Sequence, residues 1–266
     1  MTSRRRFSVK GLIICLVGIG LVAFFVPFRP QTLSSSVAFE HPANFPEAKR
    51  FAKQLFKENR RTFYCGCRFD AYGKVDLKSC GYKVQGDRRR AQRLEWEHIV
   101  PVSRIASHLP CWSGKGCCEE PKECIRGRRC CQKVDKNFQH MEADLHNLVP
   151  EIGELNAIRS NFRFGVLPHV KPGQFGQCEF KVDKNIRRVE PSASKRGLIA
   201  RTYLYMADTY NIRLSDAQRQ LFKAWNNQFP PTQEEIAWDN KIAAIQKNHN
   251  PYIVNYDMTG EKRNEY

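Results

Sequence analysis

Cysteines constrain the fold of this 266-residue chain more than any other feature of its sequence. Cys15 lies in an apolar N-terminal run, and ten more cysteines lie between residues 65 and 178. Cys65-x-Cys67 and the vicinal pairs at 117/118 and 130/131 do not match the Cys-x2-Cys pairs of structural zinc sites. An even number of cysteines in an exported chain is typical of a disulfide framework. We therefore predict disulfides, with zinc as the alternative, and assign no pairing because spacing does not determine connectivity.

The N-terminal segment predicts export. Four basic residues among the first ten precede an apolar run over residues 11–28, which is typical of a secretory signal. Small residues before and at Ala38 offer a cleavage site, so we assign residues 1–38 to the signal. The run is near the ~20 residues that span a bilayer, so an uncleaved membrane anchor is the alternative. In either case residues 39–266 are expected in the periplasm or outside the cell.

The charge of the exported part predicts an acidic partner. The first 38 residues hold five basic and no acidic residues, so +12 of the formal charge of +17 belongs to the remainder. Residues 39–266 are enough for one domain with a hydrophobic core. A basic domain of this kind is expected to bind DNA, RNA or another anionic surface, and solubility alone is the competing explanation of the charge.

Hydrophobic periodicity predicts a mixed α+β fold. Polar and apolar side chains alternate over residues 93–100, which is typical of a strand that ends before Pro101. The segment 111–131 is expected to be a cross-linked loop without packed secondary structure. Pro150 is expected in the first turn of the helix that follows it. Periodic apolar positions and capping residues predict further helices over residues 47–59, 197–210, 215–229 and 232–247.

Glu97 and His98 are the strongest candidates for chemistry, because they combine a hard oxygen ligand with a base that titrates near neutrality. A second dense region, residues 141–161, gathers carboxylates, an imidazole and amides. Hydrolysis of a phosphodiester needs a group that takes a proton from water and positive charge that stabilises the phosphate and the leaving oxygen. Neighbouring residues of a strand point to opposite faces, so both side chains can serve one site only if the strand bends or ends there.

Three motifs resemble the bacterial endonuclease I family of periplasmic and secreted nucleases. They are Glu-Trp-Glu-His-Ile-Val-Pro at residues 95–101, Met-Glu-Ala-Asp-Leu-His-Asn-Leu-Val-Pro at 141–150, and Ile-Gly-Glu-Leu-Asn followed by Arg-Ser-Asn-Phe over 152–162. The likeness covers most of residues 45–255. It implies a ββα-metal nuclease core with C-terminal helices and disulfide-linked loops. It also implies Mg²⁺ dependence and cleavage of DNA, and often RNA, with little sequence preference, giving 5′-phosphate products.

The resemblance also implies roles for individual residues. Glu97 matches the carboxylate metal ligand of the family, and Asn156 matches the amide ligand on a helix. His98 matches the general base. Arg128 matches an arginine that steadies the phosphate, and Glu142 matches an acidic residue that supports the site.

Alternatives remain for the phosphate-binding arginine and for the function. Arg126 or Arg129 could take the place of Arg128, because the loop around them is longer than usual in the family. The main rival function is a non-catalytic surface protein that binds DNA, and a third is a zinc-clustered interaction module. We expect a monomer with no protein partner, and contact with the membrane only if the N-terminal segment is uncleaved. Basic residues that could line a groove for the nucleic-acid backbone are Arg88, Arg89, Arg90, Arg93, Arg126, Arg128, Arg129, Arg159, Arg163, Lys181, Lys184, Arg187 and Arg188.

Overall fold

Two antiparallel strands form the centre of the fold in the computed structural model, which describes residues 41–118 and 124–256. The first strand, β3 (Leu94–His98), pairs with β4 (Leu148–Ile152), so that Glu97 lies opposite Val149 and His98 opposite Leu148. Helix α6 (Gly153–Arg159) begins directly after β4. The strand predicted over residues 93–100 is confirmed, and the expected strand–strand–helix order is present. The proposed signal segment lies outside the described residues.

Pro150 is not in a helix, contrary to the expectation from sequence. It lies inside β4, opposite Trp96, and all five residues of that strand are buried. A two-stranded sheet has only edge strands, and proline is tolerated on an edge because its missing N–H can face away from the ladder. The carbonyl of Pro150 accepts a hydrogen bond of 2.8 Å from the amide of Phe63, which covers this edge.

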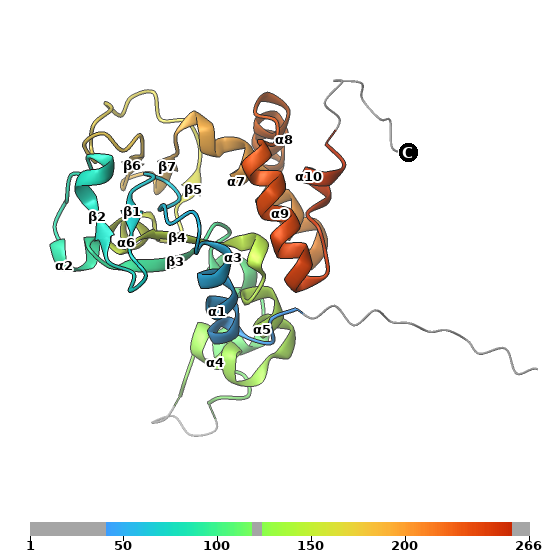
Figure 1. Cartoon of the computed structure of the whole chain (residues 1–266). Coiled ribbons are helices and arrows are strands. Elements are labelled where there is room, and N and C mark those ends of the chain that lie inside the picture. The colour runs from blue at the N-terminus through green and yellow to red at the C-terminus, as the bar shows by residue number, and fades with distance from the viewer. Residues whose placement is uncertain (1–40, 119–123, 257–266) are drawn as a thin grey trace, which may run out of the picture. The chain divides into compact units, whose positions relative to one another are not determined.

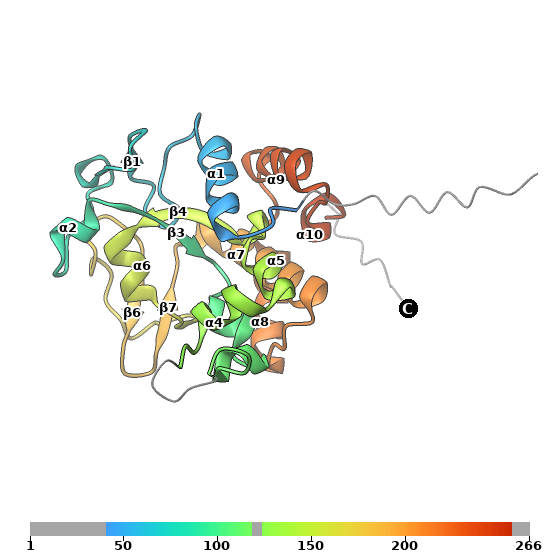
Figure 2. The same ribbon diagram turned by 90° about the horizontal axis from the view of Figure 1, so that it is seen from below.

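Helices and short strands surround the central pair, so the predicted α+β class is confirmed. Figures 1 and 2 place α2 and the β1–β2 hairpin on one side of β3 and β4, and α8, α9 and α10 on the other. The helices are α1 (Phe45–Leu55), α2 (Arg88–Ala91), α3 (Val102–Ala106), α4 (Arg128–Val134), α5 (Lys136–Glu142), α7 (Ala193–Tyr210), α8 (Asp216–Gln228), α9 (Gln233–Gln246) and α10 (Pro251–Val254). The remaining strands are β1 (Arg68–Phe69), β2 (Val75–Asp76), β5 (Arg163–Phe164), β6 (Lys181–Asp183) and β7 (Arg188–Glu190). Short 3-10 helices are η1 (Leu77–Cys80), η2 (Pro110–Ser113) and η4 (Leu145–Asn147).

N-terminal capping residues mark the starts of α8 and α9 where the sequence predicted them. Ser215 caps α8 and Thr232 caps α9, each through a side-chain oxygen that accepts a backbone N–H three residues later. Helix α7 begins at Ala193, four residues before the predicted start. Helix α1 spans Phe45–Leu55 rather than residues 47–59, because Asn44 caps it earlier.

All ten cysteines after residue 38 form disulfides, which confirms the predicted framework. Two of the bonds, Cys111–Cys131 and Cys117–Cys130, tie α4 to the segment before it. The expectation that residues 111–131 lack packed secondary structure is wrong at both ends, where η2 and α4 form. Disulfides can hold such short helices because they restrict the unfolded chain. The five pairs are Cys65–Cys178, Cys67–Cys80, Cys111–Cys131, Cys117–Cys130 and Cys118–Cys124.

A buried carboxylate, Asp144, joins the C-terminal helices to the central strands. It accepts hydrogen bonds from the hydroxyls of Tyr205 (2.7 Å) and Tyr210 (2.6 Å) on α7 and from the amide of Gln246 (3.0 Å) on α9. Its side chain is fully buried. Burial alone would raise the pKa of Asp144, but His41, His146 and Tyr210 hold the pKa well below its usual value. The negative charge is therefore part of the folded structure.

We expect Asp144→Asn to lower the free energy of unfolding by about 2–4 kcal/mol at pH 7, because it disrupts this hydrogen-bonded network around a buried charge. The folded-state pKa lies below the unfolded value of about 3.9, so the contribution is complete at neutral pH and is lost as the pH falls. The difference from the parent protein should shrink toward pH 3, as measured by denaturant titration across pH.

Asp76→Asn is the matched control for this change. Asp76 is half-exposed and faces Arg68 at 3.4 Å, so its replacement should change stability by less than about 0.5 kcal/mol. An Asp144→Asn protein as stable as this control at pH 7 would contradict the role assigned to the carboxylate.

Candidate active site

Strand β3 presents its polar side chains to two different sets of partners. Glu95 and Glu97 are two residues apart and share one face, whereas His98 points to the other face, as the alternation of a strand requires. Both Glu97 and His98 are buried. Each face is covered by residues from distant parts of the chain.

Glu97 is held by two donors in the interior. Its Oε1 accepts a hydrogen bond of 3.1 Å from the hydroxyl of Tyr64 and lies 3.1 Å from the guanidinium of Arg159. Burial raises the pKa of Glu97 to about 7, although the charge of Arg159 and the bond from Tyr64 oppose the rise. Both contacts use Oε1, so neither of them occupies the second oxygen, Oε2.

Arg159 is a fully buried arginine at the end of α6, and it fastens this helix to β3. Besides Glu97, its guanidinium donates to the backbone carbonyl of His98 at 3.1 Å and to that of Ile99. Its charged group also lies 4.9 Å from the centre of the Phe164 ring. These contacts fix the position of the C-terminal end of β3 relative to α6.

His98 is oriented by a backbone carbonyl. Its Nε2 lies 2.8 Å from the carbonyl oxygen of Glu142, and a carbonyl can only accept, so Nε2 carries the proton. The other ring nitrogen, Nδ1, then holds a free lone pair and can accept a proton. Burial, together with the charges of Arg128 and Arg159, lowers the pKa of His98 to about 3, so the ring is neutral. The Phe45 ring packs against it, with centroids 5.0 Å apart.

Glu142 also anchors Arg128, the arginine that the family resemblance matches to a phosphate-binding role. Its buried carboxylate pairs with the Nε of Arg128 and accepts from the amide of Gln132 at 2.9 and 3.0 Å. The guanidinium of Arg128 lies 4.7 Å from the centre of the Phe45 ring, the same ring that covers His98. The buried Nη2 of Arg128 has no hydrogen-bond partner among the described residues. Among the three candidate arginines, these contacts favour Arg128.

The two rival arginines have different surroundings. Arg126 is exposed, and its Nε lies 3.2 Å from the sulfur of Cys124. Arg129 is exposed as well. Neither is linked to Glu142 or to Phe45 by a contact of the kind that Arg128 makes.

Asn156 lies on α6 beside the Glu95 face. Its Nδ2 donates to Glu95 at 3.2 Å, and this carboxylate also pairs with Arg90 and Arg93 at 2.9 and 2.7 Å. The bond uses the amide nitrogen, so the carbonyl oxygen of Asn156, the atom that could hold a cation, is not part of it. Asn156 is half-buried.

The loop that carries the α2 arginines is clamped to α6. The carboxylate of Glu154 accepts from the backbone amides of Gln85, Gly86 and Asp87 and from the hydroxyl of Tyr82. A Cβ on Gly153 would meet the carbonyl oxygens of Arg90 and Arg93 at 2.7 and 2.9 Å, too close for any side chain. Glycine here lets α6 approach the neighbouring backbone closely.

The donor set fits a hard divalent cation in its chemistry. Carboxylate and amide oxygens are the ligands that Mg²⁺ accepts, and Mg²⁺ keeps several waters when few protein ligands are present. Glu97 and Asn156 could hold such an ion through Glu97 Oε2 and the Asn156 carbonyl oxygen. Over residues 41–118 and 124–256, no cluster of three or more His, Cys, Asp and Glu side chains suited to a metal is found.

Contacts divide the five residues predicted from sequence into two groups. Arg128, Glu142 and His98 are linked directly, whereas Glu97 and Asn156 lie on the α6 side of β3. Sequence reasoning missed the roles of Tyr64 and Phe45. Tyr64 is 33 residues from its partner Glu97, and no local pattern indicates a contact of that separation.

The described residues form a disulfide-linked α+β protein in which the unit of β3, β4 and α6 carries a Glu–His pair and a helical amide, and α4 adds an arginine. A family model described as Endonuclease I matches residues 47–256. The chain therefore belongs to the endonuclease I family.

Named relatives extend over most of the chain. Endonuclease-1 of Buchnera aphidicola subsp. Baizongia pistaciae is 40% identical over 83% of this chain and 88% of its own length. An extracellular deoxyribonuclease of Aeromonas hydrophila is 40% identical over 86% of this chain and 97% of its own length. A periplasmic deoxyribonuclease of the same organism is 38% identical over 83% and 90%, respectively.

We expect Gly153→Ala to lower the stability of the fold by about 1–3 kcal/mol, because the new methyl group overlaps the carbonyl oxygens of Arg90 and Arg93. Thermal unfolding of the purified protein measures this effect. Gly165→Ala is the matched control, since its Cβ would meet Arg188 at an ordinary 3.7 Å. Equal melting temperatures of the two variants would show that α6 has room to move.

Proposed function

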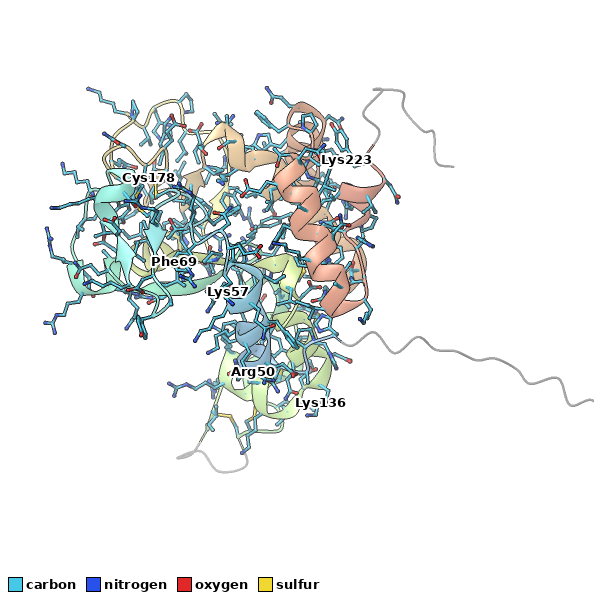
Figure 3. All side chains as sticks on the ribbon, in the orientation of Figure 1. Arg50, Lys57, Phe69, Lys136, Cys178 and Lys223 are labelled. Atoms are coloured by element: carbon cyan, nitrogen blue, oxygen red, sulfur yellow. A yellow bond between two sulfur atoms is a disulfide. The ribbon has the colours of Figure 1, made fainter. Side chains whose placement is uncertain are left out.

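We propose that this protein is a Mg²⁺-dependent endonuclease that hydrolyses phosphodiester bonds of DNA without sequence preference and leaves 5′-phosphate ends. RNA is a further expected substrate. Membership of the endonuclease I family and the relatives named deoxyribonuclease support an enzyme that acts on DNA. Exposed basic side chains are spread over the fold, as Lys57 after α1, Lys136 on α5 and Lys223 on α8 illustrate (Figure 3), so net charge alone does not locate the substrate.

One observation carries the proposal: His98 is neutral, buried and fixed by the carbonyl of Glu142 through Nε2. A general base needs a free lone pair, a fixed direction and the unprotonated state. The hydrogen bond from Nε2 supports the first two at Nδ1, and burial supports the third because it disfavours the charged imidazolium. In the proposed reaction, Nδ1 of His98 takes the proton from the water that attacks phosphorus.

We assign to Arg128 the stabilisation of the negative charge on the phosphate. The negative charge that develops during attack needs a positive partner with hydrogen-bond donors, and a guanidinium provides both. Glu142 positions this arginine by its carboxylate and His98 by its backbone carbonyl, so one residue sets the relative placement of base and cation. When bound by Glu97 and Asn156, Mg²⁺ would supply Lewis-acid stabilisation of the phosphate and of the leaving 3′-oxygen.

The proposed location is the periplasm or the medium. Two relatives are named extracellular and periplasmic deoxyribonucleases. In the part of the chain that the structure describes, every helix is too short or too polar to cross a membrane. We also propose that the protein binds its substrate as a monomer, without a protein partner.

We expect His98→Ala to abolish DNA cleavage, with a loss of at least about 10²-fold, because no other group takes the proton from water. DNA binding should change by less than about threefold, since the substitution removes no positive charge. Plasmid nicking and fluorescence anisotropy measure the two quantities. His108→Ala alters an exposed histidine and serves as the control. Parental cleavage by His98→Ala would overturn the mechanism.

Removal of divalent ions separates the enzyme from its main rival, a non-catalytic DNA-binding protein. With Mg²⁺ the plasmid should be degraded, and a chelator should stop degradation while binding persists, because phosphate contacts by arginine do not need the metal. Added Mg²⁺ should restore cleavage. An intact plasmid under both conditions would favour the binding protein, and degradation in the chelator would contradict the metal requirement.

A further inference from the structure

An arginine-rich cavity lies outside the residues of the proposed site. Its volume is about 320 Å³, near the lower end of the size of small-molecule sites. No carboxylate occurs among the described residues that line it. These residues are Arg104, Asn161, Arg163, Ile186, Arg187 and Arg188.

The positive charges of this pocket, which we call the arginine pocket, oppose one another in the folded protein. Arg163 on β5 and Arg188 on β7 are direct partners in the parallel pairing of these strands. Like charges on neighbouring strands destabilise a sheet. Burial and the charge of Arg163 lower the pKa of Arg104 at the same cavity. An anion in the pocket would relieve this repulsion.

One arginine of the pocket is already held in place. The guanidinium of Arg187 donates to Asn161 at 2.7 Å and lies 5.0 Å from the centre of the Phe162 ring. A guanidinium that is fixed before binding loses little conformational freedom when it contacts a phosphate. The pocket therefore combines a surplus of positive charge, partly offset by Asp183 opposite Arg188 in the pairing of β6 with β7, with a guanidinium that is held in place before binding.

The arginine pocket is connected to the proposed site through the chain itself. Asn161 follows Asn156 by five residues, so their Cα atoms are at most about 18 Å apart. A strand of duplex DNA rises by about 3.4 Å per nucleotide. Even with the reach of the side chains added, a phosphate in the pocket would therefore lie within several nucleotides of the Asn156 amide.

We propose that the arginine pocket binds one backbone phosphate of the nucleic acid, a few nucleotides from the phosphate that is cleaved. The inference rests on the proposed function and deepens it, because it assigns a separate subsite that contributes affinity and takes no part in the chemistry. It predicts that substrate affinity and catalytic rate can be changed independently.

The test is the double variant Arg163→Gln/Arg188→Gln, with a fluorescent 24-base-pair duplex as the probe in a chelator. Both residues are exposed, and their replacement removes a repulsion, so the melting temperature should stay the same or rise. We expect DNA binding to weaken about 3- to 10-fold near 0.1 M salt. The slope of log affinity against log salt should fall by about 1, the value for one lost phosphate contact. At saturating duplex and Mg²⁺, the cleavage rate should stay within about twofold.

Arg213→Gln/Arg219→Gln is the matched control, because it removes the same charge from the turn between α7 and α8 and from α8 itself. An unchanged affinity and salt slope in the pocket variant would overturn the proposal. Equal weakening by the control variant would overturn it too, since the effect would then be general charge. These binding measurements do not depend on cleavage, so failure of the parent protein to cut DNA would reject the proposed function separately.

Discussion

The contact between Arg159 and Glu97 is the interaction on which the rest of this structure depends. A fully buried guanidinium at the end of α6 meets a buried carboxylate on β3 and donates to the carbonyls of His98 and Ile99 as well. Loss of one partner from such a pair typically costs about 3–5 kcal/mol, because the other charge is left alone in the interior. The pair therefore fixes helix and strand in one register. The positions of Asn156, on the same helix, and of His98, on the same strand, follow from it.

Around this pair the fold gives the two neighbouring residues Glu97 and His98 different surroundings. The carboxylate lies among Tyr64 and Arg159, whereas the imidazole lies between a backbone carbonyl and the Phe45 ring. Burial acts on both but in opposite directions: it raises the pKa of the acid and lowers that of the base, since it disfavours the charged form of each. The proposed chemistry uses the neutral imidazole as the base, whereas Glu97 must be ionised to hold a metal, a state that the charge of Arg159 and the bond from Tyr64 favour.

The disulfides bear on the site through Arg128. This arginine opens α4. Two and three residues later, Cys130 and Cys131 form disulfides with Cys117 and Cys111, respectively. Cross-links restrict where this seven-residue helix can lie, and a helix so short has little stability of its own. Glu142 then orients the guanidinium over Phe45. The cysteine framework that constrains folding thus also helps to place Arg128, the arginine to which the proposed function assigns the phosphate.

The sequence alone was enough to predict the α+β class, the strand at β3, the C-terminal helices with their caps, the use of cysteines in disulfides and the endonuclease I family. These follow from local periodicity, hydrogen bonding over three residues, and motif order. It failed at Pro150, where pairing with Trp96 overrode a helical preference, and at α4, which cross-links stabilise. The tertiary structure alone decided the five cysteine pairs, the Tyr64–Glu97 contact, the protonated nitrogen of His98 and the gathering of arginines into a pocket. Each of these depends on groups far apart in the chain meeting at one point, and no local pattern encodes such a meeting.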